Sequence, residues 1–473
     1  MDLGQDHGGV AVSVGSAAYD AIVVGAGFAG LSAASRLADA GARVLVLEAR
    51  PRLGGRATAF VDRATGELVD NGQHVIFGCY HETLAFLRRV GAEEGVRLQA
   101  ALRVPFVDAD GGLTELRCPP LPAPLHLVAA VLDWPALGFR DRWSVLRLAG
   151  PLRLAQRLLR AEERGAMESP SLRVTSPGET VETWLKLNGQ GDAIRERLWN
   201  PLAIAALNQS PAEAAAQPFV RVLAGLFGSD PRDAAIGLPS RPLHLMYAEP
   251  ARAFIEARGG SVRTGALASV VVDGDRLRGV EVGGDRFLGR TVVAAVPWYA
   301  LSPLVLRTGA VPPEFAATLD RASRLESLPI VTVNLWYDRV VMDEPFVGLH
   351  GTSMHWVFDK RAAFGGAASH LSIVASGARE LVDLTNEQLV ARAAREIASV
   401  LPGAGAAHLL RGTVIREKRA TFSLAPGQPP RPGHRTAVPG LLLAGDWTDT
   451  GLPGTIESAV VSGHRAAGEV LGA

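Results

Sequence analysis

Cysteine is almost absent from the chain, which has two cysteines, Cys79 and Cys118, in 473 residues. Two thiols so far apart argue against a disulfide scaffold and favour a reducing compartment, where both are expected to be ordinary buried side chains. The sequence also lacks the H-E-x-x-H and paired C-x-x-C spacings of metal sites, so no metal ligand is predicted. A G-x-S-x-G turn, which would indicate a hydrolase nucleophile, is missing too.

An excess of charge and long apolar runs are missing as well. Lys plus Arg and Asp plus Glu both number 48, so the net charge does not suggest a nucleic-acid partner. No apolar run reaches the ~18 residues that a transmembrane helix needs. Residues 1–18 lack the basic start and the long apolar core of a signal peptide and are expected to be a flexible leader. We therefore expect a cytoplasmic protein.

Apolar residues make up 48% of the chain, enough for one large domain or two to three closely packed ones. The first recognisable unit is residues 19–50, whose pattern predicts strand, helix and strand. Ala21 to Val24 are expected to form a short buried strand, followed by a helix from about Ala29 to Ala40. A second strand is expected from Val44 to Leu47.

The first turn of this unit carries the spacing G-x-G-x-x-G at Gly25, Gly27 and Gly30. The first glycine allows a tight turn, the second lets the backbone approach a pyrophosphate, and the third lets helix and strand pack closely. The helix N-terminus attracts phosphate, and Glu48, after the second strand, can accept hydrogen bonds from a ribose diol. These features predict a dinucleotide site, whose expected contacts include four neighbouring residues: Phe28, Ala29, Ala49 and Arg50.

A second glycine turn, R-L-G-G-R, follows at residues 52–56. The amides of Gly54 and Gly55 and the guanidinium of Arg56 suit the phosphates or the ring portion of the same ligand. An NAD-binding domain would normally continue into another helix, whereas this chain goes on to D-N-G-Q-H-V. A basic surface loop is the alternative interpretation of the turn. No other dinucleotide turn occurs, so a second nucleotide domain for NADPH is not expected.

The C-terminal end has a matching pattern. Leu441 to Ala444 predict a buried strand, and a helix is expected from about Thr455 after a Gly/Pro loop. Asp446 is placed to bond a polyol chain, and the positive end of the helix can face a ring that carries negative charge. A reduced flavin carries such charge, so FAD is the expected cofactor, although an ordinary strand–helix unit is the alternative. The expected contacts are Gly445, Asp446, Gly454, Thr455 and Ile456.

The segments VVGAGFAGLSAA, LEARPRLGGRA and LLLAGDWTDTGLPGTIESA resemble the FAD-dependent amine oxidase and carotenoid desaturase superfamily. The resemblance implies an α/β fold with a discontinuous Rossmann-like FAD-binding domain and an inserted α+β substrate domain. It also implies a residue in the strands of 259–301 whose backbone touches adenine, for which Val270 is the candidate. The FAD-binding domain is expected to comprise 19–78, 246–300 and 436–473, and the substrate-binding domain 79–245 and 301–435.

The D-N-G-Q-H-V stretch, residues 70–75, is expected to return the chain past the flavin. Gly72 permits close approach of the backbone to the ring. Asn71, Gln73 and His74 would then lie near the ring or at the mouth of the substrate site. A hydrogen-bonded core histidine is the alternative interpretation of His74.

Residues 79–245 are expected to be mostly helical, and those near 120–165 carry an uneven charge. This part is apolar up to Phe139 and basic after it. Six arginines up to residue 160 are opposed only by Asp141: Arg140, Arg142, Arg147, Arg153, Arg157 and Arg160. A basic amphipathic helix can lie in an anionic membrane interface or pack on the core with a solvated arginine face. The sequence leaves both interpretations open.

Four internal segments extend the resemblance over nearly the whole chain, to the hydroxysqualene dehydroxylases of hopanoid pathways: DNGQHVIFGCYHETLAFLRRVG, RLWNPLAIAALNQSP, MHWVFDKR and EKRATFSLAPG. The implied reaction is a reduction, in which the allylic hydroxyl of a C30 isoprenoid leaves as water and reduced FAD supplies hydride to give squalene. The implied partners are this lipophilic substrate, squalene-pathway enzymes, a peripheral contact with the inner face of the membrane, and an electron donor that the sequence does not identify.

Such a reaction needs a proton donor, because hydroxide is a poor leaving group, and a long dry tunnel that shields the cation from water. By motif position, the candidates for the proton transfer are His74, Asp359 and Glu417. Three other readings stay open: a carotenoid or phytoene desaturase, a flavin amine oxidase, and a non-catalytic flavoprotein that shuttles a lipid.

Overall fold

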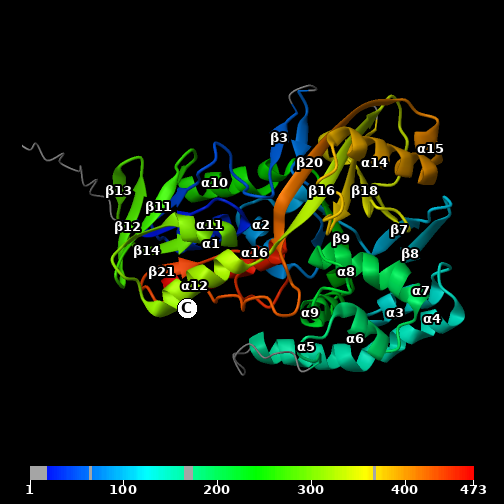
Figure 1. The fold of residues 1–473 in the computed structure, drawn as a ribbon, viewed down its shortest axis with the longest axis horizontal. Coiled ribbons are helices and arrows are strands. Elements are labelled where there is room, and N and C mark those ends of the chain that lie inside the picture. Colours follow the sequence, from blue (N-terminus) through cyan, green and yellow to red (C-terminus); the bar gives the residue numbers. More distant parts are fainter. Residues whose placement is uncertain (1–18, 63–65, 164–173, 366–368, 473) are drawn as a thin grey trace, which may run out of the picture.

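A parallel sheet on the left of Figure 1 is assembled from three distant stretches of the chain. The computed structural model describes residues 19–62, 66–163, 174–365 and 369–472, and the expected leader lies outside them. The sheet has the order β10-β2-β1-β14-β21, with every pair parallel. Its strands are β1 (Tyr19–Val24), β2 (Val44–Leu47), β10 (Ser261–Arg263), β14 (Gly289–Ala294) and β21 (Leu441–Leu443). The discontinuous Rossmann-like fold expected from the sequence is confirmed.

Helices α1 (Phe28–Asp39) and α16 (Ile456–Leu471) pack side by side on this sheet. The contact is close, because a Cβ added to Gly463 would lie 2.2 Å from the carbonyl oxygen of Ala29. Helix α10 (Glu249–Glu256) also packs on α1. Strand β2 is buried along its whole length, as the continuous apolar run V-L-V-L predicts for a parallel strand covered on both faces. The two ends of the chain therefore share one core.

A smaller sheet contains three of the strands that lie within the expected strand region 259–301. Its order is β13-β12-β11-β15. The turn glycines Gly274, Gly283 and Gly284 have φ of 60°, 58° and 96°, a region that glycine enters without steric cost. The elements here are β11 (Ala268–Asp273), β12 (Arg276–Val282), β13 (Asp285–Phe287), β15 (Val305–Thr308), α11 (Trp298–Leu304) and α12 (Pro313–Arg324).

A seven-stranded sheet forms the second large layer, and its long strands β16 and β20 run diagonally from the centre of Figure 1. The order is β20-β16-β19-β18-β17-β7-β8. Strand β20 continues to Phe422 because it pairs with β16 up to that residue. The strands are β7 (Arg103–Val107), β8 (Leu113–Arg117), β16 (Ser327–Tyr337), β17 (Phe346–Leu349), β18 (Trp356–Asp359), β19 (His370–Ser376) and β20 (Leu409–Phe422).

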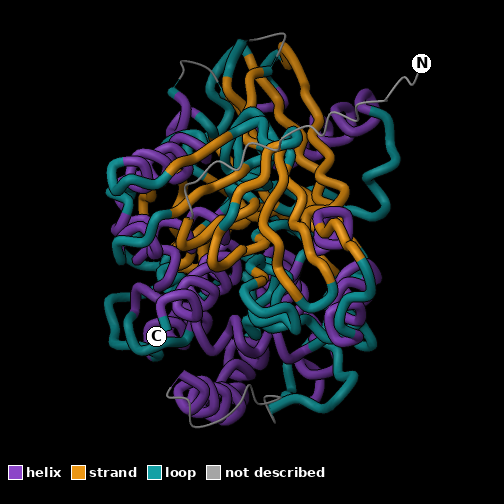
Figure 2. Tube along the Cα trace, turned by 90° about the vertical axis from the view of Figure 1, so that its left-hand side faces the viewer, coloured by secondary structure: helices purple, strands orange, loops and turns teal. Residues whose placement is uncertain are grey.

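A helical layer lies below the sheets in Figure 2 and along the lower right of Figure 1. It comprises α3 (Leu125–Asp133), α4 (Phe139–Ser144), α5 (Ala149–Glu163), α6 (Val181–Leu187), α7 (Asp192–Ile194), α8 (Asn200–Leu207) and α9 (Ala216–Leu226). The stretch 79–245 is thus helical in large part, but it also contributes strands to two sheets, which the helical expectation missed. The domain boundaries given above stay a prediction.

The remaining elements are short or peripheral. Two small sheets contain β3 (Ala59–Val61) with β4 (Leu68–Asp70), and β5 (Ile76–Phe77) with β9 (Ile236–Pro239) and β6 (Val96–Leu98). The other helices are α2 (His81–Arg89), α13 (Arg361–Phe364), α14 (Asn386–Val400) and α15 (Pro402–Gly405). Short 3₁₀ turns span Glu93–Gly95, Val145–Leu148 and Pro231–Ala234, and π turns span Arg195–Trp199 and His244–Ala248. Among the described residues, no helix is both long and apolar enough to cross a bilayer.

Candidate active site

The two glycine turns face each other at the N-terminus of α1. A Cβ added to Gly25, whose φ is 107°, would lie 2.3 Å from the carbonyl oxygen of Ala295, and one added to Gly30 would lie 1.9 Å from that of Gly25. A Cβ on Gly55 would lie 3.2 Å from the Cα of Gly27. Only glycine fits at the first two contacts, where the backbone packs closely, and glycine turns of this kind at a helix N-terminus are the form of site that binds phosphates.

The second glycine turn is held in place by a tyrosine that the sequence did not single out. Tyr247 donates its hydroxyl hydrogen to the carbonyl oxygen of Gly54 at 2.8 Å, and its ring stacks on Phe28 with 3.6 Å between the centroids. Burial raises the pKa of Tyr247, which keeps the hydroxyl a donor. Phe28, a predicted cofactor contact, thus packs against the tyrosine that holds the second turn. Tyr247 lies in no recognisable sequence motif.

Glu48 lies at the end of β2, beside the first glycine turn, as predicted. Its carboxylate is buried and accepts the Ala26 N–H at 2.8 Å and the Arg50 N–H at 2.9 Å. These bonds fix the carboxylate, and each oxygen keeps a second lone pair for an incoming hydroxyl. Arg50 in turn donates to the carbonyl oxygen of Gly55 at 3.2 Å, which ties the predicted contacts 48–50 to the second turn.

Val270, the predicted adenine contact, lies in the small four-stranded sheet. Val270 is fully buried in β11 and pairs with β12 on one side and β15 on the other, so its backbone lies inside the sheet. The chain runs beside Glu48 a few residues earlier, where the Ala266 N–H donates to the Glu48 carbonyl oxygen at 2.8 Å. Next to it, the Leu267 side chain is 76% exposed. An exposed leucine next to the ribose acid suits a planar aromatic ring better than a buried valine does.

The N- and C-terminal parts of the site meet through an ion pair. The guanidinium of Arg56 contacts the carboxylate of Asp446, which is buried, and donates to the Ala420 carbonyl oxygen at 2.7 Å. Burial by itself disfavours the charge on Arg56, but Asp446 more than offsets this and raises the pKa of Arg56 above its ordinary value. Two residues 390 positions apart are therefore held in contact, as the split nucleotide site requires.

The segment after Asp446 forms a capped helix start. The Gly445 N–H donates to Ser462 Oγ at 2.8 Å, and Thr455 caps α16 by accepting the Ser458 N–H at 3.1 Å. A Cβ on Gly454 would lie 3.3 Å from a carboxylate oxygen of Asp446. The predicted contacts Gly445, Asp446, Gly454, Thr455 and Ile456 thus lie in one compact group at the N-terminus of α16.

The D-N-G-Q-H turn lies between the cofactor segments and the seven-stranded sheet. Asn71 donates to the Arg56 carbonyl oxygen at 3.1 Å and to Glu417 Oε2 at 3.3 Å. Gln73 donates to the His74 carbonyl oxygen at 3.0 Å. A Cβ on Gly72 would lie 3.8 Å from the hydroxyl of Thr332 on β16, so this glycine is not required by crowding within the described chain.

The first proton-transfer candidate is His74, and one nitrogen of its ring has no hydrogen-bond partner among the described residues. Its Nδ1 lies 3.1 Å from the Gly72 carbonyl oxygen, which makes Nδ1 the donor and leaves Nε2 as an acceptor. Burial lowers the pKa of His74, so the neutral form dominates at neutral pH. Glu417 lies in the same cluster through Asn71, whereas Asp359 forms an ion pair with Arg361 and accepts its N–H at 2.9 Å.

Lys360 is a further member of the cluster that the sequence did not indicate. It follows Asp359 directly, and its Nζ donates to Asp70 Oδ2 at 2.9 Å and to Gln73 Oε1 at 2.7 Å. Its partner Asp70 is 290 positions away, so nothing within the segment MHWVFDKR marks the lysine as part of this cluster.

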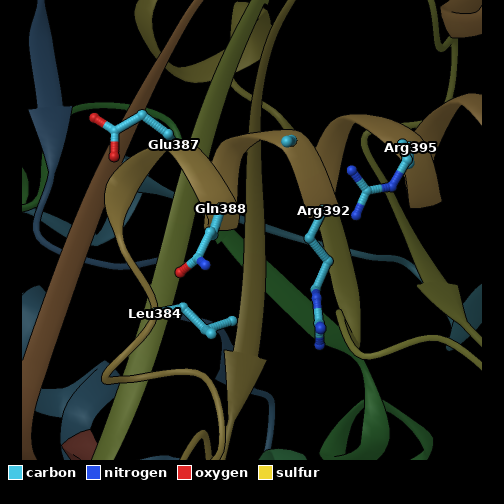
Figure 3. A pocket seen from close by; sticks show the side chains of 6 residues that line it. Leu384, Glu387, Gln388, Arg392 and Arg395 are labelled. Carbon is cyan, nitrogen blue, oxygen red and sulfur yellow. The ribbon is translucent and has the colours of Figure 1, made fainter.

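Two cavities lie outside this cluster. A depression of about 370 Å³ on α14, shown in Figure 3, is lined by Leu384, Glu387, Gln388, Ala391, Arg392 and Arg395. A smaller cavity of about 130 Å³ is lined in part by Phe106, Asn200, Ile204, Leu349, His350 and His355. Neither is the long apolar tunnel expected from the sequence, which stays a prediction. No group of three or more His, Cys, Asp or Glu side chains in the described ranges is arranged to hold a metal ion.

Comparisons with known proteins agree with this arrangement. The family of flavin-containing amine oxidoreductases matches residues 28–471. A hydroxysqualene dehydroxylase of Rhodopseudomonas palustris is 34% identical over 95% of this chain and 98% of its own, and one of Sinorhizobium fredii is 31% identical over 94% and 96%. The solved structure of an oxidoreductase from Methanosarcina mazei superposes with a TM-score of 0.70 at 18% identity, covering 94% of this chain and 99% of that one. The chain therefore belongs to the flavin-containing amine oxidoreductase family: it is an FAD-dependent oxidoreductase, and the hydroxysqualene dehydroxylases are its relatives within that family.

Proposed function

We propose that the protein removes the allylic hydroxyl of hydroxysqualene and gives squalene. The observation that carries this proposal is the nearly complete length over which two proteins named hydroxysqualene dehydroxylase match the chain, at 31% and 34% identity. The reaction consumes a hydride and a proton, and the hydroxyl leaves as water. FAD, once reduced, supplies the hydride.

The residues that would hold FAD fit its chemistry part by part. The two glycine turns at the N-terminus of α1 suit the pyrophosphate, because glycine lets the backbone amides approach it without a side chain in between. Glu48 suits the ribose diol, and the exposed Leu267, in place of Val270, suits the adenine face. Asp446 and the capped N-terminus of α16 suit the polyol chain and the flavin ring.

His74 is the group that we propose meets the substrate hydroxyl. In its neutral form, the lone pair on Nε2 accepts a hydrogen bond and orients the hydroxyl. When the ring takes a second proton, its lowered pKa makes it a stronger acid than an ordinary imidazolium, which suits protonation of a poor leaving group. Glu417 accepts a hydrogen bond from Asn71 and is proposed to fix that side chain. Asp359 is not proposed as the proton donor, because its carboxylate is paired with Arg361.

Anaerobic mixing of the reduced holoenzyme with hydroxysqualene tests the proposed reaction. The FAD is reduced chemically, excess reductant is removed, and the absorbance of oxidised FAD is followed while the products are extracted. We expect reoxidation about 100-fold faster than in buffer alone, a barrier lower by about 2.7 kcal/mol, with one squalene formed per FAD. Phytoene is the matched control. Desaturation of phytoene by the oxidised enzyme, with no response to hydroxysqualene, would overturn the proposal in favour of a desaturase.

We also propose that the helical layer contacts an anionic bilayer. Residues 139–157 form a nearly continuous helical stretch whose inner face is buried. The opposite side, termed the 139–157 face, exposes Phe139 by 77%, Trp143 by 48%, Leu146 by 43% and Leu154 by 44%. Four exposed arginines lie among them: Arg140, Arg147, Arg153 and Arg157. Apolar side chains that enter a bilayer, beside cations that meet anionic headgroups, fit this pattern.

Removing the two large aromatic groups should weaken vesicle binding. The variant Phe139→Ser/Trp143→Ser is expected to bind vesicles containing anionic lipid on the order of 100-fold less tightly, since each ring loses about 1.5–3 kcal/mol of burial. Co-sedimentation at fixed ionic strength measures the effect. Leu410→Ser, at a leucine of β20 that is 65% exposed, is the matched control and should bind as the wild type does. Equal binding by all three proteins would contradict a role for the 139–157 face.

A further inference from the structure

Lys360 holds a buried positive charge against the turn of residues 70–74. It is 3% exposed, and its ammonium group bonds both Asp70, at 2.9 Å, and Gln73, at 2.7 Å. Asp70 is also buried, and its other carboxylate oxygen accepts the Leu243 N–H at 3.1 Å. One ammonium group therefore joins both ends of the turn to the end of β18, inside the seven-stranded sheet.

The chain uses lysine sparingly, and this position is unlike the others. Of 48 Lys and Arg residues three are lysines, and the other two, Lys186 and Lys418, are exposed. A lysine places a compact charge with three donors, which suits two acceptors at an angle better than a planar guanidinium does. The Nζ also lies 4.7 Å from the centroid of the Phe364 ring. The site is therefore built around an ammonium group.

A contribution to the stability of the fold does not by itself explain the buried ion pair of Lys360 and Asp70. A buried ion pair often contributes no more than an apolar pair of the same size, because both charges lose their hydration. The hydrogen bonds point instead to the turn. Both ends of the Gln73 amide are engaged, since its oxygen accepts from Lys360 and its nitrogen donates to the His74 carbonyl oxygen. Lys360 thereby orients the residue next to His74.

We propose that Lys360 is a positioning residue for the flavin ring: it fixes the 70–74 turn, and its charge, partly offset by Asp70, favours the reduced ring. Reduction adds two electrons and one proton and leaves the ring with negative charge, which a nearby fixed cation stabilises. The inference rests on the proposed placement of the ring beside this turn. It does not depend on which substrate the enzyme reduces.

Two substitutions that break the same ion pair separate electrostatics from structure. Lys360→Met removes the positive charge and should lower the midpoint potential of bound FAD, whereas Asp70→Asn removes the negative charge and should raise it. The expected change is on the order of tenfold in the reduction equilibrium, about 30 mV for a two-electron couple. Anaerobic titration of the holoenzyme against a reference dye, without substrate, measures it.

Three further proteins complete the design. Lys360→Met/Asp70→Asn carries no unpaired charge, and its midpoint potential should return near that of the wild type. If Lys360→Met loses its FAD, the comparison of this double variant with Asp70→Asn still measures the effect of the lysine charge. Lys360→Arg keeps the charge and should also stay near the wild type. Lys186→Met makes the same substitution at an exposed lysine paired with Glu182 and should not shift the potential.

The sign of each change in the midpoint potential of bound FAD decides between an electrostatic and a purely structural role of the ion pair. Shifts of the same sign in Lys360→Met and Asp70→Asn, or shifts no larger than that of Lys186→Met, would overturn the proposal and leave a purely structural pair. Opposite shifts in an enzyme that does not respond to hydroxysqualene would sustain the role of Lys360 while removing the proposed substrate.

Discussion

Replacing Gly30 with alanine is expected to abolish FAD retention and to destabilise the protein by about 3 kcal/mol or more. The added Cβ would lie 1.9 Å from the Gly25 carbonyl oxygen and 3.2 Å from the Cβ of Ala295. Both neighbours belong to or follow strands of the parallel sheet, so α1 must move away from it. That movement displaces the backbone amides of the first glycine turn, on which phosphate binding depends.

The substitution is measured by the FAD content after dialysis and by the midpoint of urea unfolding at saturating FAD. Gly150→Ala is the matched control, because a Cβ there meets nothing within 4 Å and the residue lies in α5. Alanine favours a helix over glycine, so this variant should stay yellow and unfold at the same or a slightly higher urea concentration. A Gly30→Ala protein that keeps its FAD through dialysis would contradict the assignment of the first turn.

Local signals in the sequence predicted the first strand, turn and helix because their geometry depends on neighbours in the chain. Gly25 and Gly30 are explained by close contacts with the residues that follow β14 and β1, whereas Gly27 meets only the Cα of Gly55 at 3.8 Å. The grouping of distant segments into one domain followed from the resemblance, since nothing local shows that β21 lies beside β14. The extension of β20 could not be read from residues 416–422, because the partner that makes it a strand is β16, some 90 positions earlier.

In the cluster around the D-N-G-Q-H turn, too, local features could be predicted from the sequence and distant partners could not. Asn71, Gln73 and His74 were recognisable as an unusual polar run, but their partners were not. Lys360 is 290 positions from Asp70, and a lysine after a strand is ordinarily solvated. Its neighbour Asp359 is the residue that motif position predicts, because a carboxylic acid can act as a proton donor. The proposed adenine contact could not be chosen from the sequence either, because Val270 fits the strand pattern, whereas Leu267 is marked only by its exposure in the folded chain.

Replacing Arg56 with methionine is expected to be nearly as damaging as Gly30→Ala, for an electrostatic reason. The Asp446 side chain is 5% exposed, so without the guanidinium its carboxylate stays buried and unpaired, which costs about 3–5 kcal/mol. The N-terminal and C-terminal parts of the site also lose their direct link, and the affinity for FAD should fall on the order of 100-fold, since an ionic hydrogen bond contributes about 1.5–3 kcal/mol.

A comparison with Arg88→Met isolates the effect of burial. Arg88 pairs with Glu93 at 2.9 Å, but both side chains are at least half exposed, so its loss should leave the stability close to that of the wild type. The variant Arg56→Met/Asp446→Asn leaves no unpaired charge and should recover part of the stability that Arg56→Met loses. Urea unfolding at saturating FAD and fluorescence titration with FAD measure the two quantities. If Arg56→Met behaves like Arg88→Met in both, the ion pair does not join the two halves of the nucleotide site.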